Sequence, residues 1–429
     1  MVELNYQSGF GNQFESEAES GVLPVGQNSP QKVKGGLYTE QLTGTAFTAP
    51  RSSMQRSWMY RIRPSVQHMT NLEPTDPGLI RTGPDIQGAP TATQLRWDPF
   101  PSISADATWL TGLATVATNG NSELQTGGAV HHFVASKSMV DTVFVNTDGE
   151  LMLAPYFGRL LLRTEMGYLE LAPGQIAVVP RGIKFSVDLV DEVAQGYVCE
   201  NYGANFRLPE HGLLGIDANA LPRDFEYPVA KYDSENRPAK LVTKISGALF
   251  TNELNHSPLD VVAWHGNLAP YRYELRRFCA IGPVIFDHPD PSIWTLLSSP
   301  SDTPGTANLD FILFREHWRV AEHSFRPPWF HSNVMSELMA LIEGVYDAKA
   351  EGFVPGGISI HNSFIPHGPD SDAFRSATDA DLTPSKGPDS LAVMWESRYR
   401  WVPTSWAMAL SELQRDYPTR WSELKSEWS

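Results

Sequence analysis

The chain has 429 residues, 41% hydrophobic and 19% charged, which is typical of a soluble globular protein with a sizeable core. Its formal net charge of −16 argues against nucleic acid or an anionic membrane surface as a partner. Two cysteines cannot form a disulfide framework, and neither a signal-peptide pattern nor a membrane-length apolar run is present, so we expect a cytoplasmic protein with reduced thiols.

The N-terminal half predicts an arm followed by a β-rich region. Residues 1–60 are polar and rich in Gly, Ser, Gln and Asn, and we expect an ordered arm or a set of loops there. Residues 142–180 alternate short apolar runs with turn signals, a pattern that predicts short strands of an antiparallel sandwich or barrel. The first run ends near Asp148-Gly149, a dipeptide typical of a hairpin turn.

The C-terminal half continues with loops, strand-like runs and two candidate helices. Loops are predicted at 298–306 and 368–388, where Pro, Ser and Asp accumulate. The last forty residues predict short helices at 407–416 and 421–428, separated by Pro418. We therefore expect a mainly β chain with a few short helices.

One segment of the N-terminal half resembles a cupin motif. Residues 174–185 read G-x5-P-x-G-x2-F, which resembles the second cupin motif, G-x5-P-x-G-x2-H, with Phe185 at the position of the metal-binding histidine. The glycines and proline indicate a strand, a turn and a second strand, whereas a phenylalanine offers no ligand atom. The N-terminal half is thus expected to be a cupin-like barrel that kept its fold and lost its metal.

The C-terminal half carries the first cupin motif, H-x-H-x(3,4)-E-x6-G, with one departure. His331, Glu337 and Gly344 fit the motif, and Asn333 stands at the second histidine. With that nitrogen ligand absent, His331, Glu337 and one further histidine would form a three-ligand set with open positions, as in Fe(II) oxygenases. His331 and Glu337 are an even number of residues apart, so on one extended strand they would face the same side.

The third ligand is expected from the block I-H-N-S-F-I-P-H-G, which contains His361 and His367. His367 would come from a neighbouring strand or strand end. Only one of the two is needed as the third ligand, so lining the pocket, binding the metal and a structural role all remain open for His361. A lone histidine in a β-rich core is more often structural, but three ligand types in cupin order favour a metal site.

The remaining candidates are weaker. His288 lies in F-D-H-P-D, which also suits a surface turn, and Arg326 is a candidate positive charge near the site or a structural ion-pair partner. His131 and His132 are adjacent, so on a strand they would face opposite sides and not share a metal. The other histidines have no partner spacing and are expected to be structural; they are His68, His211, His256, His265, His317 and His323.

Three longer segments carry a resemblance to one family over essentially the whole chain. They are N-Y-Q-S-G-F-G-N-Q-F-E-S-E-A, F-T-A-P-R-S-S-M-Q-R-S-W-M-Y-R-I-R-P-S and F-R-P-P-W-F-H-S-N-V-M-S-E-L-M. In these the chain closely resembles the homogentisate 1,2-dioxygenases. The resemblance implies Fe(II) bound by His331, Glu337 and His367, with His367 also touching the substrate. It further implies that His288 is the proton acceptor and that Tyr346 contacts the substrate.

The resemblance also implies a reaction and an assembly. The expected reaction opens the ring of homogentisate, a small aromatic substrate, with both atoms of O2 to give 4-maleylacetoacetate, in tyrosine and phenylalanine catabolism. The expected assembly is a homohexamer built as a dimer of trimers. Two cupin-like β-sandwich or jelly-roll barrels are expected, residues 1–280 forming a β-rich domain with the metal-free barrel and residues 281–429 a cupin domain with the iron site.

Two alternatives remain open at this point. The ligand set alone is compatible with another metal-dependent cupin enzyme, such as an isomerase or a different aromatic-ring dioxygenase. A metal-free two-cupin binding or storage protein is the second alternative.

Overall fold

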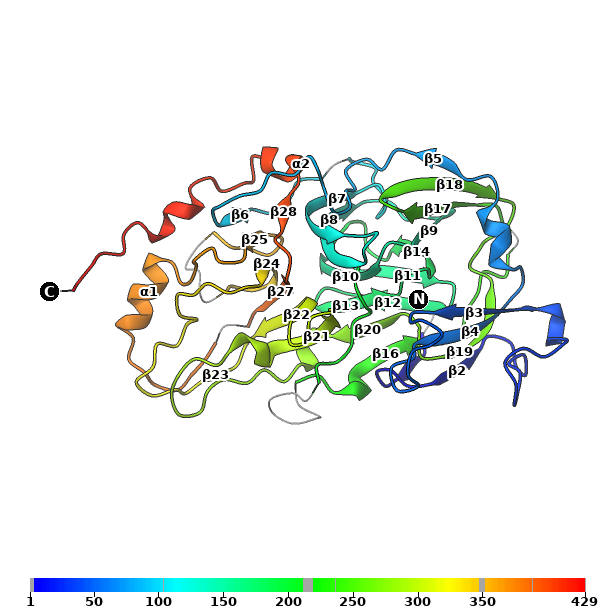
Figure 1. Ribbon diagram of the computed structural model, residues 1–429, viewed down its shortest axis with the longest axis horizontal. Coiled ribbons are helices and arrows are strands. Elements are labelled where there is room, and N and C mark those ends of the chain that lie inside the picture. Colours follow the sequence, from blue (N-terminus) through cyan, green and yellow to red (C-terminus); the bar gives the residue numbers. More distant parts are fainter. Residues whose placement is uncertain are drawn as a thin grey trace.

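The protein is mainly β. Its structure, a computed structural model, describes residues 4–102, 104–210, 219–235, 237–346, 352–387 and 389–428. In Figure 1 the N-terminal half, coloured blue to green, lies on the right, and the C-terminal half, yellow to red, lies on the left. The prediction of a mainly β chain with short helices is confirmed.

The N-terminal half contains two large sheets. The larger has nine strands, in the order β1 (Tyr6–Ser8), β16 (Phe225–Pro228), β20 (Tyr271–Glu274), β13 (Gln175–Val179), β10 (Glu150–Phe157), β15 (Ala194–Asn201), β8 (Thr126–Ala135), β7 (Leu113–Asn121) and β28 (Val402–Pro403). The other has seven, in the order β12 (Gly167–Leu171), β11 (Leu160–Thr164), β14 (Lys184–Leu189), β9 (Thr142–Asn146), β17 (Ala239–Ile245), β18 (Ala248–Leu254) and β5 (Glu73–Thr75).

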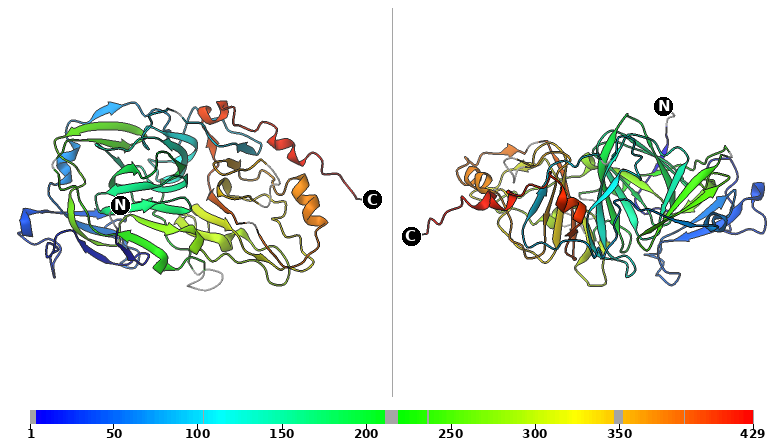
Figure 2. Two further views of the ribbon diagram at one scale, coloured as in Figure 1. Left: turned by 180° about the vertical axis from the view of Figure 1, so that it is seen from behind. Right: turned by 90° about the horizontal axis from the view of Figure 1, so that it is seen from above.

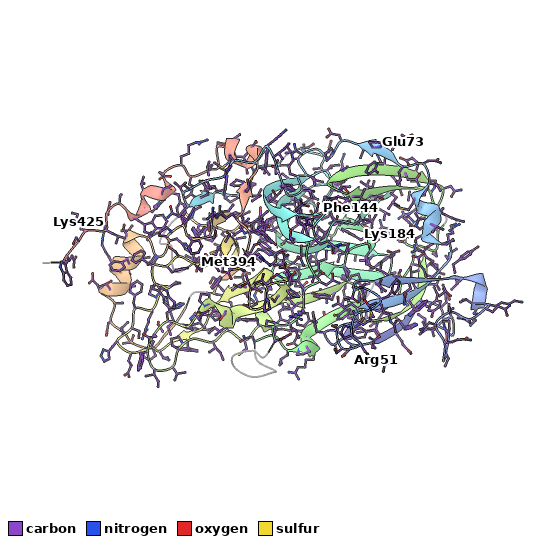
Figure 3. All side chains as sticks on the ribbon, in the orientation of Figure 1. Arg51, Glu73, Phe144, Lys184, Met394 and Lys425 are labelled. Atoms are coloured by element: carbon purple, nitrogen blue, oxygen red, sulfur yellow. The ribbon has the colours of Figure 1, made fainter. Side chains whose placement is uncertain are left out.

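The interior of this half is filled by aromatic side chains where the second cupin motif would present its histidine. Phe185 is fully buried on β14, and its ring meets Trp109 at 5.4 Å and Phe144 at 5.8 Å, both edge to face. Edge-to-face contacts between aromatic rings stabilise a core beyond the effect of the apolar area that they bury. Figure 3 labels Phe144 within the closely packed side chains of this half. Phe185 therefore serves the core.

The segment around Asp148-Gly149 is not a hairpin, which corrects the prediction. β9, before it, belongs to the seven-stranded sheet, and β10, after it, to the nine-stranded sheet. The Asp148 carboxylate accepts the backbone N–H of Ser246 and Gly247 and pairs with Lys244 Nζ at 2.6 Å. The dipeptide therefore connects the seven-stranded sheet to the nine-stranded sheet. The contacts of Asp148 hold its carboxylate against the turn between β17 and β18.

The first sixty residues contain more strand than predicted. β1 lies at the edge of the nine-stranded sheet, and a separate four-stranded sheet has the order β2 (Phe14–Glu17), β19 (Val261–Gly266), β4 (Arg56–Arg61) and β3 (Tyr38–Thr43). Pairing with β19, far along the chain, supplies the hydrogen bonds that the polar local sequence does not announce.

The C-terminal half is built on one six-stranded sheet. Its order is β21 (Thr295–Pro300), β22 (Ala307–Arg315), β27 (Leu391–Ser397), β24 (Ser336–Glu343), β25 (Ile358–His361) and β6 (Leu95–Trp97). A two-stranded sheet pairs β23 (Trp318–Arg319) with β26 (Ser385–Lys386). Each strand of this pair is only two residues long.

The two halves exchange strands and share one core. β6, from the N-terminal half, completes the C-terminal sheet, and β28, from the C-terminal half, pairs with β7. Tyr197 on β15 donates its hydroxyl to the carbonyls of Leu341 and Gly357. Figure 2 shows the two halves side by side from both directions, with the C-terminal segment projecting beyond them.

The helices differ from the predictions in position. α1 (Ser371–Thr378) lies in the segment 368–388 predicted as a loop, and α2 (Ser405–Ala409) is shorter than the predicted helix at 407–416. Instead of a helix at 421–428, a 3-10 turn, η6 (Tyr417–Trp421), includes Pro418 near its start. The other 3-10 turns are η1 (Lys34–Gly36), η2 (Ser65–Met69), η3 (Pro222–Asp224), η4 (Leu275–Arg277) and η5 (Pro291–Trp294).

Asp370 accounts for α1, because its carboxylate caps the helix by accepting the N–H of Ala373. Phe374 of α1 then packs against the rings of Phe325 and Phe330, at 5.4 and 5.6 Å. In the part of the chain that the structure describes, no helix has both the length and the apolar character needed to cross a membrane.

Candidate metal centre

His331, Glu337 and His367 converge in the C-terminal half. One ligand atom from each lies within 4.8 Å of the others. Glu337 is the second residue of β24, while His331 and His367 face one another in an isolated antiparallel bridge, with N–H···O distances of 2.9 and 3.0 Å. The structure thus brings together the three residues that the sequence singles out.

The way in which His331 reaches Glu337 differs from the prediction. β24 begins only at Ser336, so His331 and Glu337 do not share one extended strand. The chain bends between them, where the Asn333 side-chain oxygen accepts the N–H of Met335 at 2.5 Å. The even spacing is therefore not what aligns the two side chains; the bend and the His331–His367 bridge are.

Both imidazoles present the same nitrogen to Glu337. Nδ1 of His331 donates to the carbonyl of Trp329 at 2.8 Å, and Nδ1 of His367 to that of Ile365 at 3.0 Å. A carbonyl only accepts, so both Nδ1 atoms carry a proton, and in the neutral ring Nε2 keeps the lone pair. These Nε2 atoms lie 3.6 and 3.0 Å from the Glu337 carboxylate. Metal-binding histidines are typically oriented in this way.

The electrostatics of the cluster favour an ionised carboxylate. Burial by itself would raise the pKa of Glu337, but hydrogen bonds from His331, His361 and His367 hold that pKa well below its usual range. The pKa of His331 is raised, chiefly by its hydrogen bond to Glu337. When both rings are neutral, their Nε2 lone pairs and the buried carboxylate face one another with no positive charge between them, and a divalent cation would supply that charge. The residues therefore fit a metal.

Asn333, at the position of the missing cupin histidine, contacts a ligand residue. Its Nδ2 donates to Glu337 Oε1 at 3.0 Å. The amide therefore orients the carboxylate, a part that the sequence pattern alone did not suggest.

His361 lies beside the centre but outside the group of three. Its Nδ1 is 3.7 Å from Glu337 Oε2, and its ring stacks on His367 at 4.4 Å with an interplanar angle of 12°. Its Nε2 contacts the Tyr417 hydroxyl at 3.0 Å, and the Arg96 guanidinium lies 4.0 Å from the centroid of the Tyr417 ring. No sequence pattern points to Tyr417, because it lies 56 residues from His361.

A cavity beside the centre is lined by His288, Tyr346 and Arg326, with Trp294 and Phe314 among its apolar walls. The His288 ring packs edge to face on Trp294 and also on Trp329 at 5.5 Å, whose carbonyl accepts from His331. His288 Nδ1 donates to the Pro289 carbonyl at 2.7 Å. His288 is therefore half-buried in this cavity and not on a free surface turn.

Burial lowers the pKa of His288 to about 4, so its imidazole is neutral at pH 7. His317 also lines the cavity, although the sequence suggested only a structural part for it. His211 lies outside the described residues. His131 and His132 face opposite sides as predicted, the first toward Thr115 and Glu200, the second toward Tyr156.

Fold and site together define a mainly β protein with a candidate metal centre of two histidines and one carboxylate. Comparison with known families narrows this class. Residues 5–275 match the model described as "Homogentisate 1,2-dioxygenase N-terminal", and residues 276–428 match its C-terminal counterpart. The chain belongs to the homogentisate 1,2-dioxygenase family, and it is an oxidoreductase of the ring-cleaving dioxygenase type.

Curated relatives agree over the full length. A homogentisate 1,2-dioxygenase of Rhodopseudomonas palustris (strain BisB18) is 53% identical over 427 residues, covering 100% of this chain and 95% of the relative. One from Bradyrhizobium diazoefficiens is 51% identical, covering 100% and 96%.

Solved structures match only distantly. A cupin 2 conserved barrel domain protein from Leptotrichia buccalis has a TM-score of 0.30 and 8% identity, covering 68% of this chain and 90% of that one. Protein Ylba from E. coli has a TM-score of 0.29 and 8% identity, covering 75% and 93%. Scores this low add nothing to the strand order described above.

Proposed function

We propose that the protein opens the aromatic ring of homogentisate with both atoms of O2 to give 4-maleylacetoacetate, using Fe(II) held by His331, Glu337 and His367. The observation that carries the proposal is the convergence of these three donors within 4.8 Å, in a chain of this family. Two imidazoles and one carboxylate are the donors used by non-haem Fe(II) oxygenases, and they leave coordination positions open. When bound, Fe(II) would supply Lewis-acid and redox chemistry toward O2 and the ring.

The residues of the cavity would bind the substrate and hold its protons. His288 is neutral at pH 7 and can accept the proton of a ring hydroxyl. A pKa of about 4 makes it a weak base, but the negative charge of a bound substrate would raise that pKa. Tyr346 can donate its hydroxyl to a substrate oxygen, and His367 would also border the substrate.

The walls of the cavity suit an aromatic ring. Trp294 and Phe314 line it, and their rings pack on one another at 5.4 Å, edge to face. Such apolar walls exclude water and position a planar substrate between His288 and the metal centre.

Metal content tests the ligand assignment. We expect about one iron per subunit after anaerobic loading with Fe(II), and none in His331→Ala or Glu337→Ala. His265→Ala is a matched control, because His265 lies on β19 in the N-terminal half. Full iron content in the first two variants would refute the ligand set. Failure of the wild type to bind iron at all would favour a metal-free binding protein.

We further propose a division into residues 1–280 and 281–429, the second domain holding the iron. The domain boundary is supported by the two family models, which meet between residues 275 and 276. A reaction of this kind belongs to the breakdown of tyrosine and phenylalanine, for which a cytoplasmic location is expected.

We also propose that the protein is a homohexamer, a dimer of trimers. Three consecutive apolar residues, Val284, Ile285 and Phe286, are 79, 66 and 62% exposed, and apolar surface of this kind is typical of contacts between subunits. Light scattering should give a mass six times the 47.6 kDa of one chain. A monomeric mass would contradict the proposal.

A further inference from the structure

The cavity beside the metal centre is basic, although the chain as a whole is strongly acidic. Arg315, Arg319 and Arg326 line it together with His288 and His317, whereas the formal net charge of the chain is −16. Among the described residues that line this cavity, none has a carboxylate. A concave site with charge of one sign concentrates ligands of the opposite sign. The cavity therefore favours an anion.

Arg326 is held firmly, and its contacts leave its charge uncancelled. Its Nε and one terminal nitrogen donate to the carbonyl of Ala321 at 3.2 and 3.1 Å, and the other terminal nitrogen donates to that of Thr383 at 2.8 Å. All three of these contacts go to neutral carbonyl oxygens. A guanidinium has five N–H groups, so two remain for a ligand.

Arg315 differs, because it already has an acidic partner. Its guanidinium pairs with Glu316 at 3.4 Å and also donates to the carbonyls of Arg276 and Phe278. A ligand carboxylate would have to compete with Glu316 there. Arg326 is the better placed of the two to receive an anion.

The chain between Arg326 and the metal centre is short and stiff. Pro327 and Pro328 also line the cavity, and His331 follows three residues later. Proline fixes its own φ and restricts the residue before it, and five residues span at most about 17 Å. The two prolines thus restrict the chain that joins Arg326 to the ligand residue His331 and keep the two residues in one short segment.

We propose that Arg326 binds the carboxylate of the substrate and thereby selects ring-hydroxylated aromatic acids over neutral hydroxylated rings. The inference rests on the proposed function, because homogentisate carries a carboxymethyl arm on its ring. An arm anchored at Arg326 fixes the rotation of the ring, so that a ring hydroxyl meets the metal centre and His288. Charge-assisted and forked contacts of this kind are the strong ones.

The test compares homogentisate with its primary amide, which has the same ring and nearly the same shape but no charge. Arg326→Gln should lower kcat/KM for homogentisate about 10- to 100-fold, mainly through KM, as expected for the loss of a hydrogen bond to a charged group. The amide should lose less than about threefold, so the preference of the wild type for the acid collapses. Arg326→Lys should restore part of it.

Arg181→Gln is the matched control. Arg181 also holds two backbone carbonyls, those of Tyr202 and Gly203, but it lies in the turn between β13 and β14 and does not line the cavity. It should lower the melting temperature about as much as Arg326→Gln and leave the ratio between acid and amide unchanged.

Direct binding separates this inference from the proposed function. Calorimetry under anaerobic conditions on the iron-loaded protein should show the acid binding more tightly than the amide in the wild type and about equally in Arg326→Gln. Equal losses for both ligands, an unchanged ratio, or loss of discrimination in Arg319→Gln but not in Arg326→Gln would overturn the assignment. Tight binding of homogentisate without O2 uptake would instead count against the proposed reaction.

Discussion

Asn333 replaces a possible metal ligand with a group that orients one. Its amide donates to Glu337 Oε1 and accepts the N–H of Met335. We predict that Asn333→Ala lowers metal affinity at least about tenfold, because loss of an orienting contact typically costs 10- to 100-fold. Competition with a chelator measures this affinity. Asn255→Ala is the control, because the Asn255 side chain contacts His256. Equal metal affinities in the two variants would contradict the role of Asn333 in orienting Glu337.

His288 should affect the reaction without affecting the metal. His288→Ala is expected to lower kcat about 10²- to 10⁴-fold, the usual contribution of a positioned acid–base group, with the iron content unchanged. Rapid-quench measurement of a single turnover, together with iron analysis of the same sample, checks both expectations. His323→Ala, at an exposed position, should behave as the wild type. If the rate of His288→Ala falls only in proportion to a loss of iron, His288 has a structural role and not one in proton transfer.

At the scale of single residues, the sequence predicts the metal-ligand residues better than it predicts the residues that contact them. His331, Glu337 and His367 can be identified in the sequence because histidine and glutamate are metal-ligand residue types and these three stand in the order of the cupin motifs. The contact between His361 and Tyr417 joins residues 56 positions apart and follows no local pattern. His317 was missed for a similar reason, since only the folded chain places it in the cavity wall.

Gly344 directly follows β24, the strand that carries Glu337. Its φ is +79°, and a Cβ there would lie 2.2 Å from the carbonyl oxygen of Asp389. Gly305 has almost the same φ, +77°, but nothing lies within 4 Å of its Cβ position. We predict that Gly305→Ala costs about 1 kcal/mol from backbone strain alone, and Gly344→Ala at least about 2 kcal/mol more, because the backbone must also shift.

Denaturant unfolding of the two alanine variants measures this difference, and iron analysis shows whether the shift reaches the centre. We expect less iron in Gly344→Ala than in Gly305→Ala, because β24 positions Glu337. Equal stability of the two variants would show that the β24 end tolerates a side chain.

The elements that the sequence failed to predict have identifiable causes. Even spacing aligns His331 with Glu337 only on a continuous strand, and the bend at Asn333 interrupts it. Asp148-Gly149 has hairpin composition, yet the contacts of Asp148 to Ser246 and Gly247 join two layers. Asp370, which caps α1, is a recognisable signal for the start of a helix. The polar composition of residues 368–388 nevertheless favoured the prediction of a loop.

The whole molecule should lose stability in mild acid through buried neutral histidines. Burial lowers the pKa of His132 to about 3, and its side chain forms a hydrogen bond with the Tyr156 hydroxyl at 2.9 Å. In the unfolded chain the pKa is about 6.5. Between these values the unfolded state binds a proton that the folded state does not. Stability therefore falls as pH drops below 6.5, by about 1.4 kcal/mol per unit for this residue.

His132→Gln removes this contribution. Between pH 7 and pH 5 the wild type should lose about 2 kcal/mol of unfolding free energy relative to the variant, whatever the pH dependence of the shared groups. Urea unfolding at both pH values measures the difference. A difference between wild type and variant that does not change with pH would mean that His132 takes up its proton at the same pH in the folded and the unfolded state, and it would contradict this account.

The N-terminal half supports the metal centre from a distance. β6 completes the sheet that holds Glu337, and Gln94, just before β6, donates to the carbonyl of Pro366, next to His367. Phe185, which stands where the cupin motif has a histidine, packs in the core of that half. The mainly β class could be predicted from strand patterns, but the exchange of β6 and β28 could not, because strands of two and three residues carry almost no pattern.

Oxygen consumption tests the central claim most directly. The Fe(II)-loaded wild type is predicted to take up one O2 per homogentisate added and none above background with gentisate or catechol, with uptake lost in Glu337→Ala. If O2 uptake is equal for gentisate or catechol, or is retained in Glu337→Ala, the account of an Fe(II) centre that opens the homogentisate ring is contradicted.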